Sequence, residues 1–70
     1  MAKAPPHLVR EVEALLSPVE GKVPREIHRK IEGTGRESVY HALRMLIEQG
    51  RVIFEGEMGQ RRYRLAGEAT

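Results

Sequence analysis

The stretch that decides the fold is KVPREIHRKIEGTGRESVYHALRMLIEQGRVIFEGEMGQRRYRL, residues 22–65. Apolar residues recur at helical spacing at Ile27 and Ile31 and again across 39–47, as in helices that bury one face. After Gly50 apolar and polar residues alternate instead, which is the period of a strand. This order of helix, glycine turn, helix and hairpin predicts an α+β domain.

The chain on either side supplies one more helix and the boundaries. Pro6 and Pro24 each stand where a helix should begin, because proline is tolerated in the first helical turn. Gly50 is a typical helix stop. The predicted helices are 6–16, 24–32 and 35–49, and the predicted strands are 51–56 and 60–65. The pair Thr34 and Glu37 has the spacing of a capping box at the start of the third helix.

The same periodicity predicts which residues form the hydrophobic core. A lone hairpin is marginal in water, so it must pack on the helices. The predicted core consists of Leu8, Val12, Leu15, Ile27, Ile31, Val39, Leu43, Leu46, Ile47, Phe54 and Leu65.

Length and composition limit the classes of function that are possible. Seventy residues predict one domain, 1–70, with an ordered core of about 7–65, too small for a sizeable internal active site. The chain has no cysteine and no aspartate, its three histidines match no metal-ligand spacing, and no glycine-rich phosphate loop is present. We therefore expect no enzymatic activity, no cofactor and no metal. No membrane-length apolar run or secretion signal is visible, which predicts a cytoplasmic protein with no membrane partner.

The segment VPREIHRKIE, then GTGRESVYHALRMLIEQG and the hairpin RVIFEGE–MGQ–RRYRLA together resemble the winged helix-turn-helix superfamily. The resemblance covers roughly 7–65, nearly the whole chain. It implies three helices with a β-hairpin wing and binding of double-stranded DNA by a small transcription regulator. The chain departs from the usual motif at His28, where alanine is common, and in its longer glycine turn.

The resemblance, with the helical geometry, selects candidate DNA-binding residues. The second helix of the motif enters the major groove, so its outward residues are candidates for base edges: Arg44 for guanine, Glu37 for cytosine, and Tyr40 and His41 for base or phosphate. Arg36 opens this helix. An ordinary solvated helix face is the alternative for these residues, and Glu37 and Glu48 favour it.

Further arginines are candidates for the DNA backbone. Arg61, Arg62 and Arg64 lie in one run without an acid, and arginine suits phosphates and narrow minor grooves. Salt bridges to glutamates of the partner strand are the alternative. On the helix near 24–32, Arg25 and Arg29 could position the motif together with free backbone NH groups.

Three functions remain open. The first is a DNA-binding regulator, and the second is a winged-helix adaptor that binds a protein within a larger complex, since fold does not fix function. The third is binding of RNA or unspecific binding of nucleic acid. The chain is expected to be a monomer or a weak homodimer, the latter through Leu8 and Val9.

Overall fold

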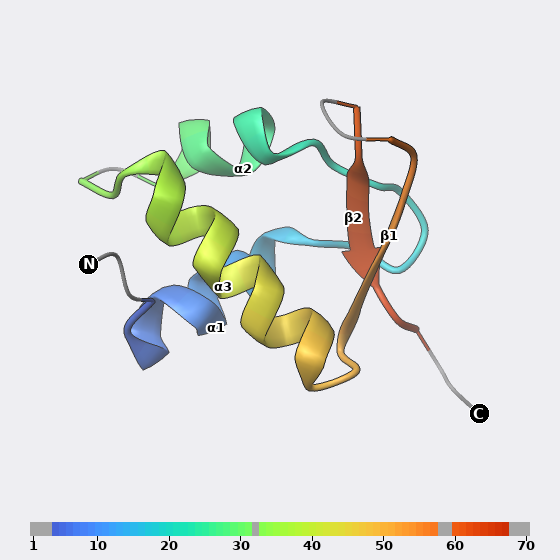
Figure 1. Ribbon diagram of the computed structural model, residues 1–70, viewed down its shortest axis with the longest axis horizontal. Coiled ribbons are helices and arrows are strands. Elements are labelled where there is room, and N and C mark those ends of the chain that lie inside the picture. The colour runs from blue at the N-terminus through green and yellow to red at the C-terminus, as the bar shows by residue number, and fades with distance from the viewer. Residues whose placement is uncertain (1–3, 32, 58–59, 68–70) are drawn as a thin grey trace.

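Three helices and a two-stranded antiparallel hairpin form the described part of the computed structural model, which covers residues 4–31, 33–57 and 60–67 (Figure 1). The elements are α1 (Pro6–Leu15), α2 (Pro24–Lys30), α3 (Arg36–Glu48), β1 (Val52–Glu55) and β2 (Arg62–Leu65). The α+β class and the element order are thus confirmed, with each boundary within two residues of its predicted position. None of these helices has the length and apolar character needed to cross a bilayer.

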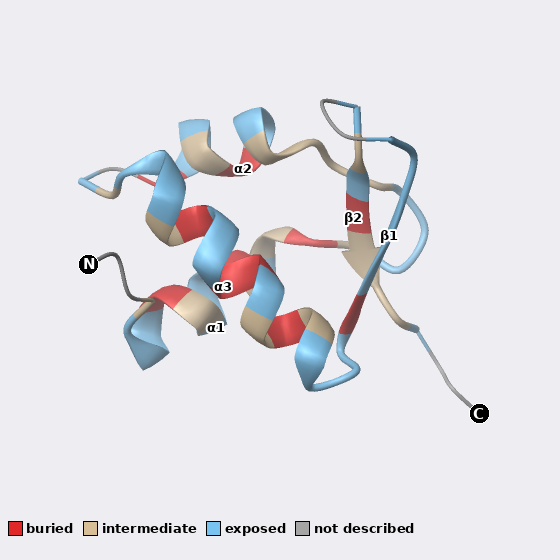
Figure 2. Cartoon of the chain, in the orientation of Figure 1, coloured by how far each residue is buried: buried red, intermediate tan, exposed pale blue. Residues whose placement is uncertain are grey.

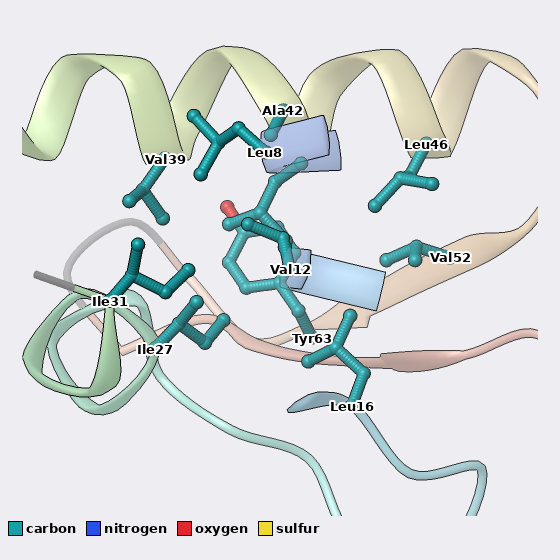
Figure 3. Packing of buried hydrophobic residues seen from close by; sticks show 11 residues of the cluster. Leu8, Val12, Leu16, Ile27, Ile31, Val39, Ala42, Leu46, Val52 and Tyr63 are labelled. Atoms are coloured by element: carbon teal, nitrogen blue, oxygen red, sulfur yellow. The ribbon is translucent and has the colours of Figure 1, made fainter. Parts of the chain in front are cut away.

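The core lies beneath α3, on which α1, α2 and β1 all pack. Figure 3 shows Val39, Ala42 and Leu46 pointing from α3 into the cluster, with Val39 toward Ile31 and Leu46 toward Val52. The ring of Tyr63 lies near the centre of the cluster. The buried hydrophobic residues are Leu8, Val12, Leu16, Ile27, Ile31, Val39, Ala42, Leu43, Leu46, Val52 and Tyr63.

The predicted core is mostly correct for the helices and partly wrong for the hairpin. Leu15, Ile47 and Leu65 are only partly buried, although they pack against the cluster. Phe54 is 39% exposed and is not a core residue. Of the residues of β1, only Val52 is buried and the other three are exposed, whereas β2 is mostly buried or half-buried (Figure 2). The alternation of apolar and polar residues predicted the correct inward face of β1. It could not show how far the hairpin extends past the helices.

The strand β2 has hydrogen-bonded neighbours on both sides. It pairs with β1, with Phe54 opposite Tyr63. On its other side Lys22 and Tyr63 exchange two backbone hydrogen bonds of 3.0 and 2.8 Å, and Leu65 donates to the Ser17 carbonyl. The loop after α1 thus anchors the hairpin, a connection that the sequence did not predict.

Gly21 permits this close approach of the loop to β2. A Cβ atom at Gly21 would lie 2.6 Å from the Cβ of Arg62. We expect Gly21→Ala to lower the free energy of unfolding by about 1–3 kcal/mol, the usual cost of overpacking, measured as a lower urea midpoint. Gly35→Ala is the control, because a Cβ there meets nothing within 4 Å. Equal midpoints for the two variants would show that the loop and β2 separate easily.

The turn between α2 and α3 is held by His28. Its Nε2 lies 2.7 Å from the Thr34 carbonyl oxygen, and Gly33 has a φ of 76°, which glycine adopts readily. The predicted capping box is wrong, because α3 begins one residue later, with Gly35 as N-cap and no cap from any described side chain. His28 therefore bridges the longer turn at the position where a closely packed helix pair has alanine.

Candidate nucleic-acid interface

The outward face of α3 carries the predicted base-reading residues. Arg36, Glu37, Tyr40, His41, Arg44 and Glu48 are all exposed. Figure 2 shows this face as blue segments that alternate with the red core segments. The Nε of Arg44 lies 3.8 Å from a Glu48 carboxylate oxygen, and both side chains are largely exposed. Such a surface pair contributes little, so Arg44 remains available to a ligand.

The three hairpin arginines, grouped together by the sequence, have different surroundings. The Arg64 guanidinium donates to Glu55 across the hairpin at 3.1 Å, so the salt-bridge alternative holds for Arg64. Arg62 is exposed, and no ion pair is found for it among the described residues. Of the two arginines of β2, Arg62 is therefore the one better able to bind an anionic ligand.

Arg61 stacks on Phe54 just before β2 begins. Its guanidinium carbon lies 4.4 Å from the ring centroid, within the range of a cation–π contact. The same ring lies 5.8 Å from that of Tyr63, at an interplanar angle of 38°. The Arg61 Nε is buried and has no hydrogen-bond partner among the described residues. The sequence did not predict this stack, although it did place one aromatic residue on each strand.

A groove separates α3 from the hairpin, next to this stack. Its volume is about 380 Å³. A separate hollow of about 520 Å³ is lined by Glu13, Pro18 and Arg51 among others. One wall of the groove carries Tyr40 and Arg44 of α3, and the other carries Phe54 and Arg61. The full lining is Tyr40, Leu43, Arg44, Ile47, Glu48, Phe54, Arg61 and Tyr63. The groove thus joins two predicted contacts of α3 to one predicted contact of the hairpin.

The face of α2 is less suited to phosphate than its arginines suggest. Arg25 and Arg29 are exposed, as predicted. However, the Glu26 carboxylate accepts a hydrogen bond from the Val23 backbone NH at 3.2 Å. A negative side chain thus lies at the first turn of α2, where the phosphate was expected. The exposed cations of this helix, Arg25, Arg29 and Lys30, are then better placed for phosphate than its backbone NH groups.

Two other surfaces bear on the remaining predictions. Leu8 is buried in the core, so the predicted pairing of two copies through Leu8 is wrong as stated. Arg51 pairs with Glu13 at 3.0 Å on the α1 side.

Within the ranges that the structure describes, no three histidine, cysteine or acidic residues gather as a metal site would require. The chain matches no protein-family model, no curated protein and no solved structure.

Proposed function

We propose that this chain is a winged helix-turn-helix domain that binds duplex DNA and serves as a small transcription regulator. The observation that carries the proposal is the juxtaposition of an exposed polar helix face with an arginine-bearing hairpin across one groove. A helix of this kind fits the major groove, and the adjacent hairpin then meets the DNA backbone or the minor groove. The basic residues at this face suit an anionic partner.

The anchored hairpin supports this proposal. Because β2 is bonded to the loop after α1 as well as to β1, the backbone that carries Arg62 is held from both sides. Phosphate contacts position a protein on DNA, and base contacts provide specificity. In the proposed complex Arg62 and Arg61 bind phosphates, while α3 presents Arg44 to the bases.

A protein-binding adaptor is the second candidate. It is favoured by the acids Glu37 and Glu48 on the α3 face and by the exposed side chains of Tyr40 and Phe54. Acids are repelled by phosphates, whereas aromatic side chains are common in protein interfaces.

The salt dependence of binding to a random duplex separates the two candidates. If several arginines meet phosphates, the logarithm of the association constant should fall with the logarithm of salt concentration, by about 0.9 per phosphate contact. A titration by fluorescence anisotropy at several salt concentrations measures this slope. Absence of binding at low salt by the folded domain would refute DNA binding and leave the adaptor.

Arg44 should determine preference at one base position. We expect Arg44→Ala to lower affinity for the best duplex by about 1–3 kcal/mol and to flatten the preference at that position. Competition between duplexes selected from a randomised pool measures both effects. Arg29→Ala is the matched control, because Arg29 is also an exposed helical arginine but lies on α2. A uniform loss across all sequences with Arg44→Ala would instead place Arg44 on a phosphate.

A further inference from the structure

We infer that the groove between α3 and the hairpin holds an unpaired nucleobase, so that the preferred DNA is a duplex interrupted by an unpaired nucleotide. This inference rests on the proposed function and names its substrate class. The lining of the groove is largely aromatic and aliphatic, which suits the flat face of an unpaired base better than a charged backbone.

The first argument comes from the planar groups of the groove. Tyr40 on one wall is 47% exposed, and Phe54 on the other is 39% exposed. The guanidinium carbon of Arg61 lies 4.4 Å from the centroid of the Phe54 ring, so a guanidinium group and an aromatic ring are already in contact on this wall. Bases stack on aromatic rings and on guanidinium planes in single-stranded complexes.

The second argument comes from charge. Arg44 and Arg61 stand on opposite walls of the groove, so each wall carries a positive charge beside the proposed base. Among the described lining residues Glu48 is the one acid, and it already pairs with Arg44 at 3.8 Å. A groove with two guanidinium groups and one paired carboxylate favours an anionic occupant over an apolar helix.

The third argument comes from shape. The groove has a volume of about 380 Å³, which lies within the range of about 300–1,000 Å³ found for small-ligand sites. Its floor is formed by the buried Leu43 and Tyr63. A flat base can therefore enter edge-on between the walls and lie against an apolar floor, while its sugar and phosphates stay outside.

The experiment compares three duplexes of one sequence. The first is fully paired, the second carries one extra unpaired thymidine at its centre, and the third carries an abasic nucleotide at that place. The abasic probe keeps the backbone and its flexibility but lacks the base. We expect the unpaired thymidine to raise affinity about tenfold over the paired duplex, as for one stacked base. The abasic probe should lose most of this gain.

The variants are chosen from β1. Phe54→Ala should abolish the gain from the unpaired base, and Phe54→Trp should retain it. Ile53→Ala is the matched control, because Ile53 is 38% exposed and is the neighbour of Phe54, on the opposite face of the hairpin. It should keep the gain. Circular dichroism confirms that each variant is folded.

The possible outcomes distinguish the two proposals. Equal affinity for all three probes, or a gain that survives in Phe54→Ala, would overturn the inference while leaving duplex binding in place. Equal gains from the thymidine and the abasic nucleotide would also overturn it, because flexibility alone would then explain them. Failure to bind any of the three probes at low salt would refute the proposed function itself.

Discussion

Replacement of Leu43 by alanine is expected to remove most of the stability of the domain. Leu43 is 1% exposed and lies on α3, the helix on which the other elements pack. Truncating a buried leucine costs about 2–5 kcal/mol, as lost burial plus the cavity left behind. A 70-residue chain has about 4–10 kcal/mol of unfolding free energy in total. We therefore expect a large fall in the urea midpoint and in the melting temperature.

The matched control for Leu43→Ala is Ile53→Ala. Ile53 is an exposed aliphatic residue of β1, and its truncation should change the unfolding free energy by no more than about 0.5 kcal/mol. Similar losses in the two variants would mean that Ile53 is buried by a partner in solution. An unchanged midpoint in Leu43→Ala would contradict the packing of α3 on the core.

The helices could be predicted from the sequence because their signals are local. The spacing of Ile27 and Ile31, and that of Val39 and Leu43, depends only on helical geometry, and the structure buries all four. Leu16 lies within the predicted helix 6–16 but is not in the predicted core; it follows the last residue of α1 and is buried. The capping box failed for a non-local reason. Thr34 lies in a turn whose conformation depends on His28, six positions earlier.

The hairpin was harder to predict because its environment depends on contacts distant in sequence. Burial of Tyr63 and exposure of Phe54 follow from where β2 lies between β1 and the loop at 17–22. Nothing in the run of three arginines indicates that Arg64 pairs with Glu55 while Arg61 stacks on Phe54. The sequence could therefore identify the candidate site residues, but not which of them are occupied by neighbours.

Loss of Arg61 and Arg62 together is expected to weaken binding to every duplex. Each residue is proposed to meet one phosphate, and two contacts account for about 1.8 units of the salt slope. If the double variant and the wild type bind equally at about 1 M salt, the variant should bind roughly 60-fold more weakly than the wild type at about 0.1 M salt. The variant Arg61→Gln/Arg62→Gln removes both charges and keeps part of each aliphatic stem, and it also removes the guanidinium contact of Arg61 with Phe54. Anisotropy titrations over a salt series measure both the loss and the slope.

The control for this double variant is Arg51→Gln/Arg64→Gln, which lowers the net charge equally. Both of these arginines are already paired, Arg51 with Glu13 and Arg64 with Glu55, so removing them should change the salt slope much less. If the two double variants lose affinity equally, net charge alone attracts the DNA and the hairpin has no special place at the interface. If only Arg61→Gln/Arg62→Gln flattens the salt slope, the phosphates lie beside the groove. The hairpin then contacts the DNA backbone while the neighbouring α3 contacts the bases.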